Sequence, residues 1–417
     1  MITIQPFKAL RPEAQHAKQV ASLPYDVLNS REAKTEAQGN PSSFLHITKS
    51  EIDLPDNIDV HSQQVYDAAK ENLDAFISRN ILFRESKPCY YIYQLIMPPL
   101  NSAGSRRSQT GLVCGSSVYD YENGLIKKHE FTRPEKELDR INHIKTTGAQ
   151  TGNVFLAYKN VDEIDTVIDK WKKDKNPVYD LTAPDKVQHT IWIINDNDTI
   201  QLLTDLFKTK VPCTYIADGH HRAASAAKVR EALGKNAAAG ANIFLTTLFP
   251  ANQLHIMDYN RLIKDLNGMN AADFLAALTQ NFNVTKADKA VAPARLHQFG
   301  LYMDKQWYML EAKENTYTND PIGILDVTIL QNNILAPLLG IVDQRTDKRI
   351  DFVGGIRGLA ELEKRVDSGE MKLAFSLHPV SIEQLLDIAD SGNVMPPKST
   401  WFEPKLRDGL LTHLISD

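Results

Sequence analysis

The chain has 417 residues, of which 42% are hydrophobic and 24% charged, and its formal net charge at pH 7 is −5. This balance is typical of a soluble globular protein, and the length exceeds one ordinary hydrophobic core, which predicts two domains. The negative charge argues against a nucleic-acid binder, because such a protein needs a basic surface to neutralise phosphates. Three scattered cysteines without metal-ligand spacing argue against a disulfide framework or a structural zinc site.

The first residues show no signal-peptide pattern, and no apolar run approaches the roughly 18 residues needed to cross a bilayer. These features predict a cytoplasmic protein without membrane contact. The sequence leaves the oligomeric state, including a homo-oligomer, open.

The first clear helix is predicted over residues 61–80, because apolar residues recur on one helix face: Val65, Ala69, Leu73 and Phe76. An aromatic and β-branched stretch predicts a strand over 87–97. A polar turn at 101–111 and a second strand at 111–121 complete a segment that resembles a hairpin. Further strands are predicted over 187–196, 211–218 and 241–250, with a helix over 198–209.

From about residue 260 the sequence changes character, and helices alternate with short strands. The predicted helices cover 271–282, 324–341, 356–369 and 381–392, and strands are predicted within 299–312 and 371–379. We therefore predict an N-terminal domain over residues 1–258 and a C-terminal domain over residues 259–417. Both are expected to be α+β, because the strand pairs are not separated by regular crossover helices.

One strand-to-helix turn, Asp218–Arg222, concentrates polar side chains after an apolar strand. A helix start offers unpaired N–H groups and the positive end of a dipole, so it attracts anions. Gly219 permits a sharp turn, and Arg222 can donate paired hydrogen bonds to phosphate oxygens. His220 and His221 point in different directions, so at most one of them faces the same ligand atom as Arg222. Asp218 is placed to hold Mg²⁺ or to accept a hydroxyl proton.

The plainer interpretation of this turn is an N-cap, since aspartate is a favoured cap residue and the histidines can be solvated. The concentration of five polar or glycine residues at one turn favours a ligand site instead. The chemistry suits a phosphorylated ligand.

Two other clusters carry candidate site residues. His129 and Glu130 precede Pro134 and are therefore expected in a loop, with Arg140 on the helix that follows and able to reach back to the same pocket. An exposed charged helix is the alternative interpretation. Near the C-terminus, two consecutive prolines restrict the backbone just before Lys398, Ser399 and Thr400. These residues supply one cation and two hydroxyls, which could bind phosphate or carboxylate. A surface loop is the alternative there.

The chain resembles the family called domain of unknown function 1015 over nearly its whole length. The resemblance rests on motifs in a fixed order: PFKALRP, LPYDVLN, HEFTRPEKELDR, IADGHHRAASA and MPPKSTWFEPKLRDGL. That family is similar in fold to the ParB/sulfiredoxin superfamily, which includes free serine kinases. The resemblance implies that Gly219, His221 and Arg222 hold nucleotide phosphates. It also makes Asp26, in LPYDVLN, a candidate substrate contact.

Sulfiredoxin activity requires a cysteine inside the turn, where this chain has His220, so the reductase activity is not expected. The free serine kinases transfer a phosphoryl group from a nucleotide to a small amino acid, and their acidic turn is similar to Asp218-Gly219-His220. The resemblance therefore implies catalytic roles for Asp218 and His220 and phosphate contacts for Gly219, His221 and Arg222. From the chemistry of the other two clusters, we predict that Glu130 is also catalytic, because a carboxylate beside an imidazole can take a proton. The further predicted phosphate contacts are His129, Arg140, Lys398, Ser399 and Thr400.

Together these features predict a ParB/sulfiredoxin-like core in the N-terminal domain, with the C-terminal domain closing over the cleft. The expected cofactors are ATP or ADP with Mg²⁺, and the expected activity is phosphoryl transfer to a small hydroxyl-bearing metabolite such as free serine. A nucleotide-binding regulatory module without catalysis is the alternative. A metal-dependent hydrolase that uses the histidines is a third possibility, but the sequence contains no HxH or HExxH motif that would support it.

Overall fold

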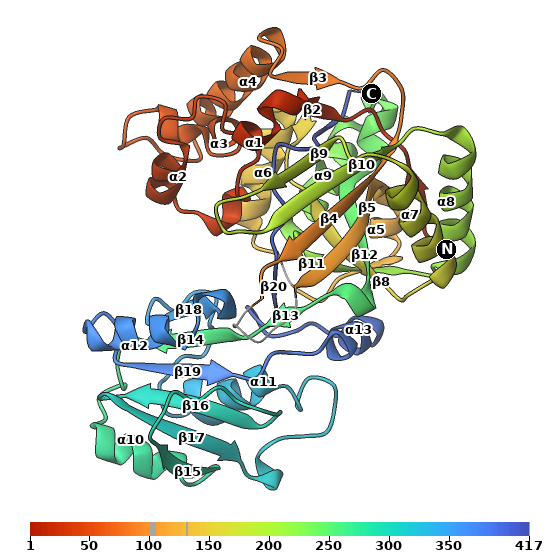
Figure 1. Cartoon of the computed structure of the whole chain (residues 1–417). Coiled ribbons are helices and arrows are strands. Elements are labelled where there is room, and N and C mark those ends of the chain that lie inside the picture. Colours follow the sequence, from red (N-terminus) through yellow and green to blue (C-terminus); the bar gives the residue numbers. More distant parts are fainter. Residues whose placement is uncertain (100–105, 131, 417) are drawn as a thin grey trace. The chain divides into compact units, whose positions relative to one another are not determined.

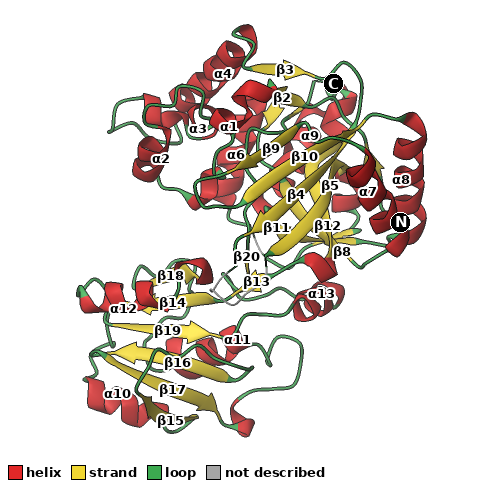
Figure 2. Ribbon diagram, viewed as in Figure 1, coloured by secondary structure: helices red, strands yellow, loops and turns green. Residues whose placement is uncertain are grey.

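The structure is a computed structural model that describes residues 1–99, 106–130 and 132–416. The chain forms two compact units, both of which combine sheets and helices (Figures 1 and 2), and this confirms the predicted α+β class. The first unit contains Met1–Lys128, Thr132–Leu254 and Pro404–Asp417, and the second contains His129–Phe131 and His255–Glu403.

A mixed nine-stranded sheet forms the centre of the first unit, with the strand order β6-β11-β8-β12-β5-β4-β10-β9 and β1 paired to β5. Pairing is antiparallel except between β11 and β6 and between β12 and β8. The strands are β1 (Ile4–Gln5), β4 (Tyr90–Met97), β5 (Arg107–Ser117), β6 (Ile126–Lys127), β8 (Val154–Tyr158), β9 (Tyr179–Thr182), β10 (Gln188–Ile194), β11 (Thr214–Asp218) and β12 (Ile243–Pro250).

Helices lie against this sheet (Figure 2). Apolar side chains of the sheet and of several of these helices form a continuous buried core. The longer ones are α2 (Ser30–Ala37), α4 (Gln63–Ser78), α6 (Pro134–Thr147), α7 (Asp162–Asp174), α8 (Asn197–Lys210) and α9 (His220–Leu233). Shorter ones are α1 (Ala17–Val20), α3 (Leu45–Thr48) and α5 (Val118–Glu122). Alanines of α9 join the main core, whereas the apolar face of α4 joins a smaller cluster with Phe44 and Ile47.

Several predicted elements of this unit are confirmed. The helix predicted over 61–80 is α4, and its four periodic apolar residues are buried. The strands predicted on either side of 101–111 are β4 and β5, which pair antiparallel as a hairpin does. Residues 101–105 of the predicted turn lie outside the described residues, and the prediction of a turn over 107–111 is wrong, because β5 already begins at Arg107. The prediction that the second strand continues to residue 121 is wrong: the strand ends at Ser117, whose side chain accepts the Asp120 N–H and starts helix α5.

The end of the chain is tied to the first unit by backbone pairing. Strand β21 (His413–Leu414) pairs with β7 (Ala149–Gln150). Ser22 and Asp408 exchange two backbone hydrogen bonds of 3.0 and 3.1 Å. Another short pair joins β2 (Leu10–Pro12) to β3 (Leu82–Arg84). The β21–β7 pair and the Ser22–Asp408 bonds bring the residues after 404 beside the N-terminal loops.

The second unit contains a six-stranded antiparallel sheet with the order β15-β17-β16-β19-β14-β18. The strands are β14 (Tyr259–Ile263), β15 (Phe282–Ala287), β16 (Gln298–Met303), β17 (Gln306–Ala312), β18 (Ile350–Gly354) and β19 (Leu373–Leu377). A separate pair joins β13 (Ile256–Met257) to β20 (Trp401–Phe402). Asp304 and Lys305 link β16 to β17 with positive φ angles of 50° and 62°, as a two-residue hairpin turn requires.

The helices of the second unit are α10 (Ala271–Leu278), α11 (Asp326–Leu330), α12 (Leu359–Asp367) and α13 (Ile382–Asp390). All four lie within predicted helices. The segment predicted as one helix over 324–341 begins as α11 but continues as a π-helical turn over Gln331–Leu335. There the Asn333 side chain donates to the carbonyls of Ile329 and Thr316.

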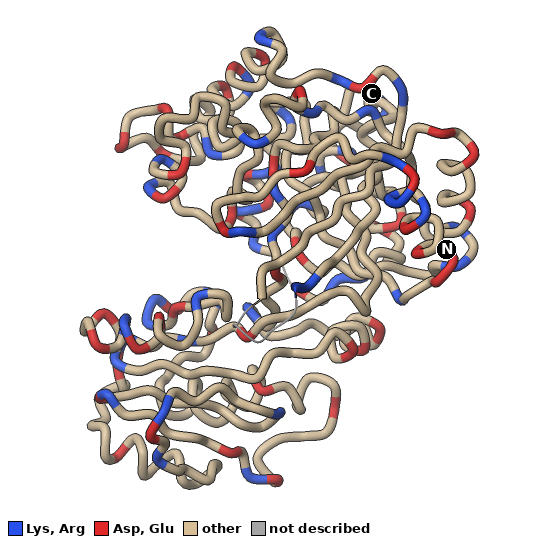
Figure 3. Tube along the Cα trace, viewed as in Figure 1, with Lys and Arg blue, Asp and Glu red and all other residues tan. Residues whose placement is uncertain are grey.

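Among the described residues, no helix is both long and apolar enough to span a membrane. Acidic and basic residues are interspersed along the traces of both units (Figure 3).

Candidate functional site

The Asp218–Arg222 turn joins a buried strand to a buried helix. Residues of β11 before Asp218 are buried, and a bulge shifts its register against β8 between Ile216 and Asp218. Gly219 is the N-cap of α9 with φ 97°, and as a glycine it provides no side chain to cap the helix. A Cβ atom at Gly219 would lie 3.3 Å from the Cα atom of Val154. Glycine is therefore needed here both for its backbone conformation and for the close approach of β8.

Replacing Gly219 with alanine is expected to lower the free energy of unfolding by about 2 kcal/mol, because a side chain is strained at positive φ and crowds β8. The matched control is Gly148→Ala, since Gly148 also has a left-handed conformation (φ 70°) but open space around its Cα. The control should lose about 1 kcal/mol. Chemical denaturation of both variants measures the difference, and equal losses would show that contact with β8 is unimportant.

Asp218 is ionised and held by a lysine from the end of the chain. Lys405 Nζ lies 3.0 Å from Asp218 Oδ2, and 33% of the Asp218 side chain is exposed. Burial alone would raise the pKa of Asp218, but the charges of Lys405 and Arg222 outweigh it and hold this pKa well below its usual range. Asp218 is therefore a weak base that carries a negative charge throughout the neutral range.

Arg222 is bound by the Asp26 carboxylate. Its Nη2 atom lies 2.8 Å from both Asp26 oxygens, and its Nη1 atom donates to the Asn153 carbonyl at 2.6 Å. The Nε atom is buried and has no partner among the described residues. An anion at Nη2 would therefore have to share that donor with Asp26 or displace its carboxylate, whereas an anion at Nε would leave the Asp26 pair intact.

The two histidines of the turn have different surroundings, in keeping with their expected divergence. His220 is buried, with 6% of its surface exposed. His221 is partly exposed, and its Nε2 atom accepts the backbone N–H of Arg133 at 2.9 Å. His221 therefore connects α9 to the residue that precedes α6.

Arg140 of α6 lies close to Tyr25, which precedes Asp26. The Arg140 guanidinium is 4.0 Å from the centre of the Tyr25 ring, and that of Arg222 is 5.3 Å from it. Arg140 also pairs with Asp139 at 2.7 Å. Burial raises the pKa of Tyr25 to about 12, so its phenol stays neutral beside the two cations.

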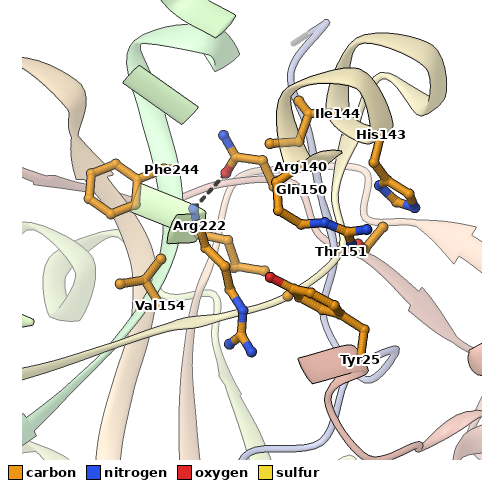
Figure 4. Close-up of a pocket in the computed structure, with 11 residues that line it drawn as sticks. Tyr25, Arg140, His143, Ile144, Gln150, Thr151, Val154, Arg222 and Phe244 are labelled. Carbon is orange, nitrogen blue, oxygen red and sulfur yellow. Dashed lines mark hydrogen bonds between the residues drawn. The ribbon is translucent and has the colours of Figure 1, made fainter. Parts of the chain in front are cut away.

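A small cavity opens between these groups (Figure 4). Its volume is about 20 Å³, enough for one water molecule. Gln150 accepts the Leu245 N–H at 2.7 Å on one side of it. The lining residues are Tyr25, Arg140, His143, Ile144, Gln150, Thr151, Gly152, Val154, Arg222, Phe244 and Leu245. Two predicted residues, Arg140 and Arg222, therefore line one cavity.

Asp408 and Lys405 belong to the site but were not predicted. Only 2% of Asp408 is exposed, and its Oδ2 atom has no partner among the described residues. Burial raises the pKa of Asp408 to about 7, partly offset by Arg222. Both residues lie in the second half of the MPPKSTWFEPKLRDGL motif, whereas the predicted phosphate contacts lie in its first half. That motif was the available signal for them.

Five predicted residues belong to the second unit. His129 and Glu130 precede α6, as predicted, and the His129 carbonyl accepts the Met395 N–H at 2.8 Å. The others lie in the loop before β20: Lys398, Ser399 and Thr400. Within the first unit, the structure brings together the turn, Asp26 and Arg140.

The carboxylates of the site do not form a metal-binding cluster on their own. Within the residues that the structure describes, no three His, Cys, Asp or Glu side chains are grouped to hold a metal ion. Asp218 is the carboxylate of the turn, and Lys405 already binds one of its oxygens. A Mg²⁺ ion here would have to take most of its ligands from a bound phosphate group and water, as Mg²⁺ commonly does.

The chain belongs to the family described as "Protein of unknown function (DUF1015)", which matches residues 4–328. No curated protein matches it significantly. Among solved structures it is similar to a conserved hypothetical protein from Pyrococcus furiosus, with 14% identity, a TM-score of 0.38, and coverage of 73% of this chain and 95% of the other.

It is also similar to a free serine kinase in complex with AMP, with 11% identity, a TM-score of 0.36, and coverage of 71% of this chain and 91% of the other. A third likeness is to C-terminally truncated SbnI from Staphylococcus aureus, with 10% identity, a TM-score of 0.33, and coverage of 72% and 87%. At TM-scores this low, the likeness does not transfer a ligand or a reaction to this chain.

Proposed function

We propose that the Asp218–Arg222 turn binds the phosphate groups of a nucleotide, and that the chain transfers a phosphoryl group to the hydroxyl of a small metabolite. Free serine is the first acceptor to test. All the side chains to which the proposal gives a role belong to the first unit, and Asp218 is the negatively charged residue of the turn. It follows the motif resemblance, in which Gly219, His221 and Arg222 match phosphate-binding positions of the ParB/sulfiredoxin superfamily.

One observation carries the proposal: an ionised carboxylate lies between two cations at the start of a helix whose N-cap is a glycine. The helix start and the two cations, Lys405 and Arg222, favour an anionic ligand. The carboxylate would repel that ligand unless it had a separate task, and orienting an acceptor hydroxyl is such a task. A purely structural helix start would not need this combination of charges.

The weak basicity of Asp218 is compatible with phosphoryl transfer. The transition state is loose, so catalysis depends mainly on positioning and on stabilising charge at the phosphoryl oxygens. In the proposed site, Asp218 accepts a hydrogen bond from the acceptor hydroxyl and takes its proton late in the reaction. His220, His221 and Arg222 hold and neutralise the phosphates, and Lys405 fixes the orientation of the Asp218 carboxylate.

The proposed cofactors are ATP or ADP with Mg²⁺. The metal would neutralise phosphate charge, and Asp218 is the turn residue that would contact it. The Lys405 ammonium would then have to shift from the Asp218 oxygen that it binds now.

Asp218→Asn is expected to reduce the formation of phosphoserine about 10²-fold, because the amide cannot accept the hydroxyl proton. The affinity for ADP should stay within a few-fold, since the substitution removes a negative charge near the phosphates. The assay incubates protein with serine, Mg²⁺ and ATP or ADP and detects phosphoserine by mass spectrometry, while calorimetry measures ADP binding. Asp205→Asn, an exposed change on α8, is the control.

Full activity of Asp218→Asn would remove Asp218 from the mechanism. If the unmodified chain forms no product with a panel of hydroxylated metabolites, it is not a phosphotransferase of this kind.

The alternative function is a nucleotide-binding regulatory module without catalysis, and the Asp26–Arg222 pair favours it. A phosphate that displaced Asp26 from Arg222 would release the loop around Tyr25 and so transmit binding to the N-terminal segment. ADP binding without product, together with altered hydrogen exchange of residues 23–29, would support this alternative.

A further inference from the structure

Arg261, on strand β14 of the second unit, is a buried cation without an acidic partner. None of its surface is exposed. Its donors reach the Tyr259 carbonyl, the carbonyls of Lys398 at 3.0 Å and Pro397 at 3.4 Å, and the Gln344 side chain at 3.4 Å. No carboxylate of the described residues pairs with it. Its guanidinium also lies 5.4 Å from the centre of the Phe352 ring. A buried charge that is met only by dipoles and a ring face costs free energy, so its position calls for an explanation.

The Arg261 guanidinium fixes the direction of two peptide groups in the loop that precedes β20. The carbonyls of Pro397 and Lys398 both point at it. In a planar trans peptide the N–H points opposite to the C=O. The N–H groups of Lys398 and Ser399 therefore both point away from Arg261.

These two N–H groups are not used elsewhere in the fold. The Lys398 N–H donates no hydrogen bond to any residue that the structure describes, and the Ser399 N–H faces the Pro396 carbonyl across the turn at residues 397–398 without a hydrogen bond within 3.5 Å. Successive N–H groups that point the same way around a residue in the left-handed region form a concavity that binds anions. Lys398, between them, has φ 58°.

The loop is held in this shape although its sequence does not favour it. A lysine at positive φ is strained, and such strain persists only where the surroundings impose it. The hydrogen bonds of Arg261 to the Pro397 and Lys398 carbonyls hold the backbone in this conformation. The Ser399 hydroxyl also holds it by donating to the Pro396 carbonyl at 2.6 Å. The Lys398 side chain is exposed, 5.8 Å from the centre of the Tyr259 ring, and has no ion pair with a described residue.

We propose that residues 396–400 form a phosphate-binding site of the second unit, in which the N–H groups of Lys398 and Ser399 and the Lys398 ammonium hold the anion and Arg261 is a positioning residue. The ligand is a phosphate group, free or as a monoester, because two backbone donors and the cation of the same exposed side chain suit a tetrahedral anion with several oxygens. The site does not depend on the reaction proposed above, since all its groups belong to the second unit.

A lysine footprint tests the site on the full chain. The chain is treated with an acetylating reagent with and without inorganic phosphate, and peptide mapping follows the rate at which Lys398 is acetylated. Phosphate is expected to slow the acetylation of Lys398 at least threefold and to leave Lys364, an exposed lysine of α12, unchanged. Equal rates with and without phosphate, or equal slowing of both lysines, would overturn the proposal. O-phosphoserine in place of phosphate shows whether a monoester binds more tightly than the free anion.

Arg261→Gln tests the positioning role. Lys398 should remain reactive in this variant but lose its protection by phosphate, whereas a merely structural arginine would leave the protection intact in the folded protein. If Arg261→Gln does not fold, Lys398→Gly decides the question. Glycine adopts positive φ without strain, so this variant should keep its melting temperature or exceed that of the unmodified chain. Its affinity for phosphate, measured by calorimetry, should fall at least tenfold, and unchanged affinity would refute the site.

The footprint is repeated in Asp218→Asn to separate this site from the proposed reaction. Protection of Lys398 in that variant is expected even though turnover is lost. Loss of the protection in Asp218→Asn would overturn the proposal of an independent site and leave the proposed reaction untouched.

Discussion

Arg222→Gln is expected to lower the free energy of unfolding of the first unit by about 3 kcal/mol. The guanidinium is 10% exposed and bonds both Asp26 oxygens and the Asn153 carbonyl. Its loss leaves Asp26, Asp218 and Asp408 facing one another with less positive charge between them. Removing one member of a largely buried ion pair is costly, because the remaining charges are left uncompensated. Denaturation followed by hydrogen exchange in the first unit measures the effect.

Arg230→Gln is the matched control, since it makes the same change on the same helix. Arg230 bonds the side chains of Asn242 and Tyr119, which carry no negative charge. Its replacement should cost about 1 kcal/mol or less. A similar loss in both variants would show that the charge cluster around Arg222 contributes nothing specific.

The double variant Asp26→Asn with Arg222→Gln measures how much of the effect comes from their pair. If Asp26 is the main partner, the double variant should lose less stability than the sum of the single ones. Additive losses would mean that Asp218 and Asp408 dominate instead. Arg222→Lys should recover little, because one ammonium cannot reach both Asp26 and the Asn153 carbonyl in the geometry of the guanidinium.

The elements of the fold that could be predicted are those with strong local patterns. The periodic face of α4 and the apolar strand β12 are encoded within their own residues. The short helix α5 was missed because its start depends on one serine hydroxyl after an apolar strand. The return of the last residues to the first unit was not predictable, because it depends on pairing between β7 and β21, which are far apart in sequence.

The candidate site was predictable where polar residues were concentrated within one motif. Asp26, Arg140 and Arg222 came from three separate motifs, and the structure places them around Tyr25. Asp408 lies in the MPPKSTWFEPKLRDGL motif, but nothing within that motif singled it out, since an aspartate before a glycine is typical of an ordinary turn. Its burial, and the unpartnered oxygen that results, arise from tertiary packing alone.

Asp408→Asn is expected to stabilise the first unit at pH 8 by up to about 4 kcal/mol and to have little effect near pH 4. Burial raises the pKa of Asp408 to about 7, whereas the unfolded chain has the ordinary value near 3.8. Between these values the folded state binds the proton more tightly, so its stability falls as the pH rises and reaches its lowest level above pH 7. Asparagine keeps the shape and abolishes the ionisation.

The second unit provides an internal control for this pH dependence. Burial also raises the pKa of Asp326 to about 7, and its Oδ1 atom accepts the His297 N–H at 2.8 Å. Asp326→Asn should therefore flatten the pH dependence of the second unit and leave that of the first unchanged. Hydrogen exchange between pH 5 and pH 8, corrected for intrinsic rates, reports each unit separately. If Asp408→Asn leaves the pH dependence of the first unit as steep as before, Asp408 is already ionised at neutral pH, and the carboxylates around Arg222 then share its charge without a bound proton.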